Sequence, residues 1–196
     1  MYFLIKRAFD IFLVIFFAPI WVPVMAVVAV LVKCGSAGPV FFKQKRYGRN
    51  RRFFMIYKFR SMYTTAPADM PTHLLQNPEA FITPIGRVLR SSSLDELPQL
   101  LNIIRGDLSI VGPRPALWNQ DDLIAERDKY GANAVPVGLT GLAQVSGRDA
   151  LSIEEKAASD GEYVRRKGFF FDLWIMMRTV YCVVGRFGVR EGASKN

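Results

Sequence analysis

The sequence predicts a helix-rich α+β protein, with an N-terminal re-entrant membrane helix followed by a compact cytosolic domain. Three observations predict this fold class. Residues 11–32 are apolar and carry no charge, aromatic and β-branched runs flank a turn signal within residues 39–60, and several later segments show helix-capping patterns. We therefore divide the chain into a membrane-anchoring segment, residues 1–36, and a globular domain, residues 37–196.

The apolar segment is long enough to span a bilayer, but two features favour a re-entrant helix, which enters and leaves the same leaflet. Pro19 and Pro23 lie inside it one turn apart, and each removes a backbone donor that lipid does not replace. We expect a kink at these prolines. Basic residues also flank both ends, with Lys6 and Arg7 before the segment, which favours placing both ends on the cytoplasmic side. A single transmembrane span is the alternative.

Local patterns predict the remaining elements. We expect a β-hairpin over residues 39–60, a strand over 108–111, helices over 83–90, 98–105, 117–130 and 152–167, and loops over 64–82 and 136–148. Residues 169–186 form a last, very apolar helix. Because Asp172 and Arg178 would be costly inside lipid, we expect this helix to be amphipathic and to lie at the membrane interface.

The composition limits the class of ligand. A formal net charge of +9 attracts polyanions, which include nucleic acids, anionic lipids and phosphorylated substrates. No nucleic-acid-binding motif accompanies this charge, so we expect no nucleic-acid partner. The two cysteines and the single histidine have no metal-ligand spacing. Any metal would therefore have oxygen ligands, which points to Mg²⁺.

The adjacent carboxyl groups of Asp95 and Glu96 allow two interpretations. Ser93 and Glu96 have the spacing of a capping box, in which both residues would cap a helix. Pro98 weakens this interpretation, because a proline at the fifth position of a helix is unfavourable. Alternatively, Asp95 attacks a phosphate as a nucleophile and Glu96 binds Mg²⁺. Two unit charges 4 Å apart repel by about 4 kcal/mol at an effective dielectric constant of 20, so this chemistry requires nearby cations.

Several arginines are candidates to supply that positive charge. Arg87 and Arg90 are three residues apart and share one face of the predicted helix over residues 83–90. Arg114 lies between two prolines in a stiff loop, where it is either a surface residue or a precisely placed phosphate ligand. Arg148 ends a glycine-rich loop.

Five blocks occur in a characteristic order. They are Lys6-Arg7-x-x-Asp10 before the apolar segment, Lys58-Phe-Arg60-Ser-Met62, Ser93-Leu-Asp-Glu-Leu-Pro-Gln-Leu100, Gly106-Asp-Leu-Ser-Ile-Val-Gly-Pro-Arg-Pro115 and Gly138-Leu-Thr-Gly-Leu-Ala-Gln-Val-Ser-Gly-Arg148. Together they resemble the bacterial sugar transferases, the small monotopic polyprenyl-phosphate phosphoglycosyl transferases. The resemblance covers nearly the whole chain.

The resemblance implies a function and a mechanism. A sugar-1-phosphate would pass from a UDP-sugar to undecaprenyl phosphate through a covalent aspartyl-phosphosugar on Asp95, with release of UMP. Glu96 matches the carboxylate that binds Mg²⁺. Arg90 and Arg114 match positions associated with phosphate or nucleotide binding, and Lys58, Arg60 and Arg148 match other motif positions of the family. Together with Arg87 and Pro113, we expect these residues to bind substrate. Residues 37–196 would then be a catalytic domain on the cytoplasmic face of the bacterial inner membrane, in contact with membrane lipids.

This sequence departs from the family pattern at two positions. The kink has Ala18 before Pro19, where the family commonly has serine, and Ser146 replaces a frequent asparagine. The sugar is not identified; N,N′-diacetylbacillosamine is our first expectation, with galactose, glucose and N-acetylgalactosamine open. The competing hypothesis is a non-catalytic basic protein that binds lipid at the membrane surface, which would not explain two acids within a basic region.

Overall fold

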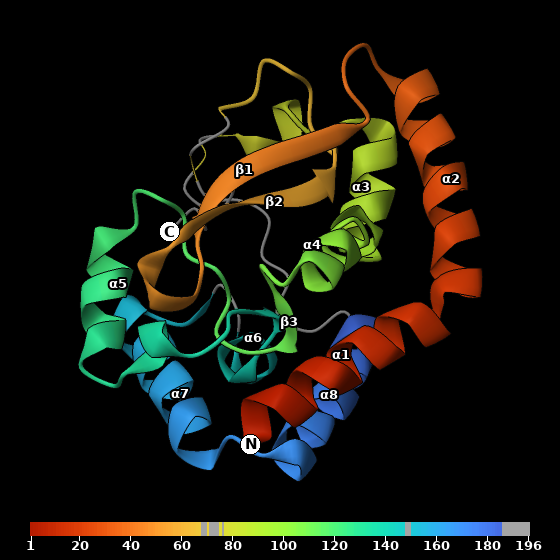
Figure 1. The fold of residues 1–196 in the computed structure, drawn as a ribbon. Coiled ribbons are helices and arrows are strands. Elements are labelled where there is room, and N and C mark those ends of the chain that lie inside the picture. The colour runs from red at the N-terminus through yellow and green to blue at the C-terminus, as the bar shows by residue number, and fades with distance from the viewer. Residues whose placement is uncertain (68–69, 71–74, 76, 148–149, 186–196) are drawn as a thin grey trace.

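The computed structural model describes residues 1–67, 70, 75, 77–147 and 150–185. These residues form a helix-rich α+β domain, which confirms the predicted class (Figure 1). The helices are α1 (Tyr2–Phe16), α2 (Ala18–Gly35), α3 (Pro84–Ser91), α4 (Gln99–Arg105), α5 (Asp121–Asp128), α6 (Leu142–Ser146), α7 (Ile153–Arg166) and α8 (Phe169–Val184). The strands are β1 (Phe41–Tyr47), β2 (Phe53–Phe59), β3 (Ser109–Val111) and β4 (Gly138–Thr140).

The N-terminal apolar segment is broken at Phe17, where α1 ends and α2 begins at a sharp angle (Figure 1). Pro19 lies in the first turn of α2, where its missing amide costs little. The break removes the usual amide partner of the Val14 carbonyl, and the indole Nε1 of Trp21 donates to that carbonyl at 2.8 Å instead. α2 continues through Pro23, so this proline lies within a helix and not at the break.

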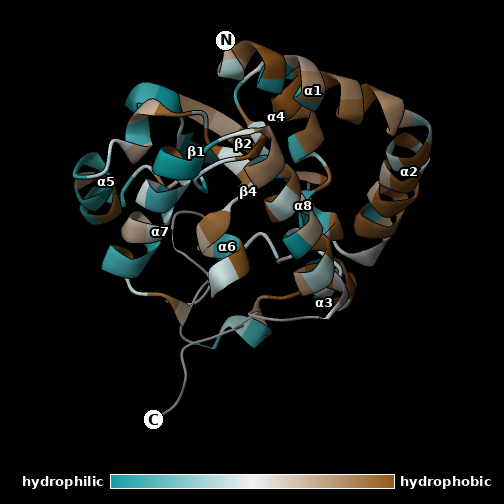
Figure 2. Cartoon of the chain, turned by 90° about the horizontal axis from the view of Figure 1, so that it is seen from below, coloured by the Kyte–Doolittle hydropathy of each residue, from teal (hydrophilic) through white to brown (hydrophobic). Residues whose placement is uncertain are grey.

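Both N-terminal helices present apolar surface, as Figure 2 shows. Among the described residues, α2 is the one helix that is long and apolar enough to cross a membrane. One side of α2 nevertheless packs on the domain. Val28 and Val32, four residues apart, contact a buried cluster that includes Phe59 of β2 and Leu89 of α3. The anchoring segment predicted as residues 1–36 therefore packs directly against the globular part.

A buried polar network joins α1 to α8. Lys6 Nζ donates to Asp172 Oδ2 at 2.7 Å, and the hydroxyl of Tyr2 donates to the same oxygen at 2.7 Å. Tyr163 of α7 donates to the other carboxylate oxygen at 3.1 Å. Asp10 accepts from Ser109 Oγ at 2.6 Å. The polar residues of α1 are thus bonded inside the protein, while the opposite side of the helix is apolar and exposed.

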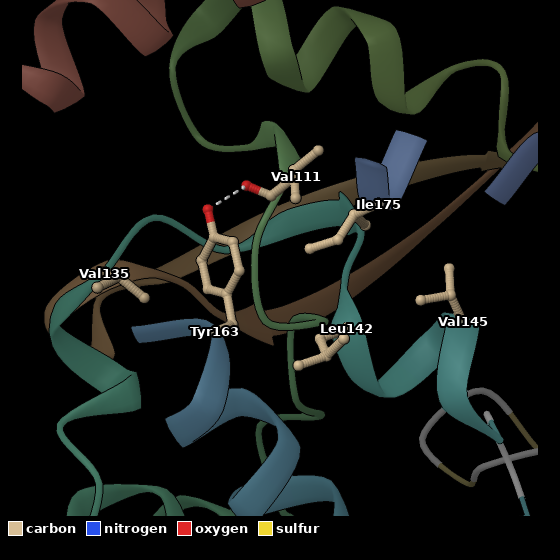
Figure 3. Close-up of a cluster of buried hydrophobic side chains, with 6 residues drawn as sticks. All are labelled: Val111, Val135, Leu142, Val145, Tyr163 and Ile175. Atoms are coloured by element: carbon tan, nitrogen blue, oxygen red, sulfur yellow. Dashed lines mark hydrogen bonds between the residues drawn. The ribbon is translucent and has the colours of Figure 1, made fainter. Parts of the chain in front are cut away.

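Two small sheets organise the centre of the domain. β1 pairs antiparallel with β2, which confirms the predicted hairpin, and β3 pairs parallel with β4. A cluster of buried side chains lies around the second sheet, built from Val111, Val135, Leu142, Val145, Tyr163 and Ile175 (Figure 3). Because β3, β4, α6, α7 and α8 all contribute or contact this cluster, it ties the last third of the chain to the strand that precedes residue 112.

The structure corrects two predicted elements. The helix expected over residues 117–130 covers only Asp121–Asp128, because Leu117 instead forms an antiparallel bridge with Arg46. The loop expected over residues 136–148 contains β4 and α6. The glycines of this segment predicted a loop, although part of it forms a buried strand. The remaining helices agree with the predictions; Thr83 caps α3 through Gly86 N, and the capping box of α7 has both hydrogen bonds.

A buried ion pair joins α5 to α7, and its removal tests how much it stabilises the fold. Arg127 Nη2 lies 2.6 Å from Asp160 Oδ2, and both side chains are buried. We expect Arg127→Met to lower the free energy of unfolding by about 3–5 kcal/mol, because it leaves a buried carboxylate without its partner. The control is Arg166→Gln, whose pair with Glu162 is exposed; it should change stability by less than about 0.5 kcal/mol. Equal losses in denaturant titrations would contradict this expectation.

Candidate active site

Asp95 and Glu96 lie in a single 3-10 turn, Leu94–Glu96, immediately before α4. Ser93 precedes it in the left-handed region, with φ 58°, and its side chain makes no capping hydrogen bond. The capping-box interpretation of Ser93 and Glu96 is therefore wrong. The left-handed residue is sterically unfavourable for a non-glycine side chain and turns the chain so that both carboxyl groups point into the domain. α4 begins only after Pro98, so the acidic pair is separate from that helix.

Two cations bind one oxygen of Glu96. Lys58 Nζ lies 2.7 Å from Glu96 Oε1, and Arg114 Nη2 lies 2.6 Å from the same atom. Burial alone would raise the pKa of Glu96, but Arg114 and Lys58 outweigh it and hold this pKa well below its usual range. Glu96 is therefore a carboxylate at neutral pH and balances part of the positive charge around it.

Asp95 is also buried, and nearby cations neutralise its negative charge less completely than that of Glu96. Its Oδ2 lies 4.0 Å from Lys58 Nζ, at the limit of an ion pair. Burial raises the pKa of Asp95, and the charge of Glu96 raises it further, whereas Lys58, Arg90 and Arg114 lower it. A carboxylate with little direct hydrogen bonding from its cations is a more available nucleophile than one that is fully paired. The geometry thus separates the two acids into a charge-paired Glu96 and an available Asp95.

The hairpin places Lys58 beside the acidic pair. Side chains alternate between the two faces of a strand, and the register pairs Gln44 with Ile56 and Phe42 with Lys58. Residues of even number therefore share the inner face of the hairpin. Since β2 packs on the turn that carries Asp95, this face supplies Lys58 to the site.

A close crossing of two backbone segments places Arg114. Gly112 N donates to Thr140 O at 2.8 Å, and Gly138 N donates to Pro113 O at 2.9 Å. A Cβ on Gly112 would lie 2.3 Å from Pro136 O, and one on Gly138 would lie 2.1 Å from Gly112 N. The glycines of both motifs are thus needed for this contact. The amide of Gly138 is therefore bonded within the protein.

The structure also reveals a cation that the sequence analysis did not select. Arg46, on the inner face of β1, donates from Nη1 to Pro115 O at 3.0 Å. Burial and repulsion from Arg114 lower its pKa to about 9, while attraction from Glu96 opposes this shift. The alternation of side chains along β1 could have predicted that Arg46 lies on the same face as Lys58. That prediction requires the register of the hairpin, which the sequence did not give.

The other predicted site residues have different surroundings. Arg90 is close enough to Asp95 to lower its pKa, as expected for a member of the site. Arg87 lies on the exposed part of α3 and pairs with Glu79 at 3.3 Å, so it does not share the surroundings of Arg90. Pro113 is fully buried and stiffens the loop before Arg114. Arg148 lies outside the described residues.

Arg60 makes its described hydrogen bonds with the end of α2. Its guanidinium donates to the carbonyls of Ser36 and Ala37, and one nitrogen lies 3.4 Å from Val32 O. A cation at a helix C-terminus stabilises the exposed carbonyls of the last turn. The structure therefore shows Arg60 bonded to the C-terminal end of α2, and its contact with substrate stays a prediction.

The site fits a metal that the substrate helps to hold. Within the described residues no group of three acidic, histidine or cysteine side chains lies together. Mg²⁺ commonly takes only one or two carboxylates and completes its octahedral shell with phosphate oxygens and water. Glu96 and Asp95 meet this minimum, and both cationic contacts of Glu96 fall on Oε1.

Known proteins are similar to this chain over most of its length. The family profile described as "Bacterial sugar transferase" matches residues 1–186. The uncharacterized sugar transferase EpsL of Bacillus subtilis is 40% identical over 96% of this chain and 91% of its own length. The exopolysaccharide production protein ExoY of Rhizobium meliloti is 37% identical, covering 91% of this chain and 84% of its own. The UDP-glucose:undecaprenyl-phosphate glucose-1-phosphate transferase of Escherichia coli is 37% identical over 91% of this chain, but only 40% of its own length.

A buried carboxylate pair beside lysine and arginine is suited to binding and transferring a phosphorylated group. The chain belongs to the bacterial sugar transferase family. The resemblance drawn from the five sequence blocks is thereby confirmed, and with it the assignment to the phosphoglycosyl transferases.

Substitutions of Arg114 and Arg87 test which arginines belong to the active site. We expect Arg114→Gln to lower the rate of sugar-phosphate transfer by about 100-fold or more, because a charge-assisted contact to the site is lost. Arg87→Gln should remain within about threefold of the parent, because Arg87 pairs with Glu79 at the surface. Steady-state rates of the two purified variants distinguish them, and similar losses in both would place Arg87 inside the site.

Proposed function

We propose that this enzyme transfers a sugar-1-phosphate from a UDP-sugar to undecaprenyl phosphate and releases UMP. The observation that carries the proposal is the unequal pairing of the two acids. Glu96 binds Lys58 and Arg114 at 2.7 and 2.6 Å, while among the described residues the ion-pair contact of Asp95 is with Lys58 at 4.0 Å. This arrangement supports Asp95 as the nucleophile, with the cations available to bind phosphate oxygens.

The transfer proceeds in two displacements at one phosphorus atom. A carboxylate oxygen of Asp95 attacks the β-phosphorus of the UDP-sugar, the bond from that phosphorus to the bridging oxygen breaks, and UMP leaves with that oxygen. An oxygen of undecaprenyl phosphate then attacks the same phosphorus and releases the Asp95 carboxylate, which gives an undecaprenyl-diphosphate sugar. The attacking lipid phosphate is already an anion, so neither step requires a general base.

Charge compensation is the main task of the surrounding residues. Lys58, Arg90 and Arg114 offset the negative charge of the diphosphate and of the two acids. Glu96 would hold Mg²⁺ together with the diphosphate, and the bound ion would neutralise charge on the phosphate oxygens. Lys58 binds Glu96 at 2.7 Å and lies 4.0 Å from Asp95, so its charge acts on both carboxyl groups.

We further propose that α1 and α2 form a re-entrant membrane element and that the catalytic domain lies on the cytoplasmic face of the inner membrane. Exposed apolar side chains support membrane contact; they include Leu4, Phe12, Ile15 and Phe16 on α1, Ile20, Val27 and Val30 on α2, and Phe170, Trp174 and Met177 on α8. The packing of α2 along α3 supports re-entry, because α3 carries arginines that would be costly in lipid. The sharp break at Phe17 supports it as well.

The donor is a UDP-linked hexose or N-acetylated sugar. The Escherichia coli relative is named for UDP-glucose, and ExoY for exopolysaccharide production, which supports a role in the first membrane step of glycan assembly. A donor of the N,N′-diacetylbacillosamine type, with galactose and N-acetylgalactosamine, completes the panel to test. Purely lipid-binding function, the competing hypothesis, finds no support in a family of enzymes with a buried acidic pair.

Asp95→Asn tests the covalent route. We expect no detectable UMP release from any UDP-sugar in the panel, because the amide cannot form the phosphosugar ester, while circular dichroism remains that of the parent. Asp121→Asn on α5 is the matched control and should keep full activity. Intact-mass spectrometry of the parent with its donor alone should show a phosphosugar adduct. An active parent that never carries this adduct would contradict the mechanism.

Cysteine labelling tests the re-entrant topology. Cys34 and Cys182 are replaced by alanine, and a single cysteine is then added either before Met1 or in place of Glu126 on α5. In intact cells, both positions should resist a membrane-impermeant maleimide and react only after permeabilisation, because both would lie on the cytoplasmic side. Labelling of the N-terminal cysteine alone in intact cells would show a transmembrane span.

A further inference from the structure

Arg46 and Gln44 share the inner face of the hairpin with Lys58 but have no part in the chemistry described above. Two nitrogens of the Arg46 guanidinium donate to one oxygen, and we call this pair of bonds the fork. Nε lies 3.0 Å and Nη2 lies 2.6 Å from Gln44 Oε1. Gln44 is buried, at 6% exposure. A planar guanidinium held by two bonds on one edge has little freedom to turn.

The third nitrogen of Arg46 reaches the residue after Arg114. Nη1 donates to Pro115 O at 3.0 Å. The neighbouring backbone reinforces this contact, because Tyr47 N donates to Ala116 O at 2.9 Å and Arg46 forms an antiparallel bridge with Leu117. β1 therefore holds the segment that directly follows Arg114, on the opposite side from the glycine crossing at Gly112.

Arg114 and Glu96 both act on the charge of Arg46. Arg114 lowers the pKa of the Arg46 guanidinium and Glu96 raises it, while the bond to Pro115 O places Arg46 beside the Arg114 segment. The positive charge of Arg46 repels that of Arg114, so this placement is unfavourable unless other contacts hold Arg46 there. Those contacts are the fork to Gln44 and the bond to Pro115 O, which suggests that the position of this charge matters.

We propose that Arg46, oriented by Gln44, is a positioning residue that holds Arg114 on Glu96 and so keeps Asp95 available as the nucleophile. This inference rests on the proposed function. It assigns the hairpin a role in catalysis beyond that of carrying Lys58, and it makes Gln44-x-Arg46 part of the active-site machinery.

Kinetic variants of the full chain in detergent test the proposal. With the most active donor of the UDP-sugar panel, Arg46→Gln should lower kcat/KM by about 100-fold, as expected when a site group is misplaced by about 1 Å. Arg46→Lys keeps the charge but not the fork and should lose about tenfold. Gln44→Leu should resemble Arg46→Gln, whereas Gln44→Glu keeps the acceptor and should retain activity within about threefold. Lys45→Gln, on the outer face of the same strand, is the control.

A double-mutant cycle separates positioning from a general structural role. If Arg46 acts through Arg114, Arg46→Gln should cost less than about threefold in an Arg114→Gln background. Independent losses that multiply would overturn the proposal. If Arg46→Gln does not fold, the same double-mutant cycle is measured with Arg46→Lys. The tenfold loss expected for Arg46→Lys should then be absent in the Arg114→Gln background.

Hydrogen–deuterium exchange provides a readout that does not require activity. In Arg46→Gln, the peptide covering residues 114–118 should exchange at least about tenfold faster, while that of α4, residues 99–105, should be unchanged. Equal exchange in both proteins would overturn the inference. If the parent releases no UMP from any donor, the proposed function fails, but this exchange experiment still decides whether Arg46 holds the Arg114 segment.

Discussion

The structure depends on one electrostatic requirement, the neutralisation of two adjacent acids at a buried position. Without cations, their mutual repulsion and the cost of burial would drive protons onto both carboxyl groups. Lys58 and Arg114 meet the requirement unequally, because both contact Glu96 and neither binds Asp95 closely. In the proposed mechanism, this inequality distinguishes the nucleophile, Asp95, from Glu96, whose charge is balanced by both cations.

The rest of the fold supplies those two cations from separate parts of the chain. Lys58 comes from the inner face of the hairpin, and its place follows from the alternation of side chains along β2. Arg114 comes from a loop whose backbone crosses β4 so closely that Gly112 and Gly138 cannot carry a side chain. The glycines of these two motifs therefore act on the site through backbone packing, whereas Arg114 contacts Glu96 directly.

The membrane segment is attached to the same framework by polar contacts. Arg60 binds carbonyls at the end of α2, and Lys6 pairs with Asp172 across α1 and α8. These contacts occupy the inward side of helices whose outward side is apolar. A helix with such two-sided character packs against the domain on one side and leaves its other side apolar and exposed.

The sequence by itself determined the local elements and the identity of the acids. Capping residues, glycine stops and strand alternation indicated α3, α4, α7 and the hairpin, since these signals act over a few residues. Spacing could not decide whether Ser93 and Glu96 cap a helix, and it did not find Arg46 or the anchoring contacts of Arg60. Those depend on which residues meet across the fold. Only the tertiary structure decided them, because a charge acts through distance in space, and distance along the chain does not specify it.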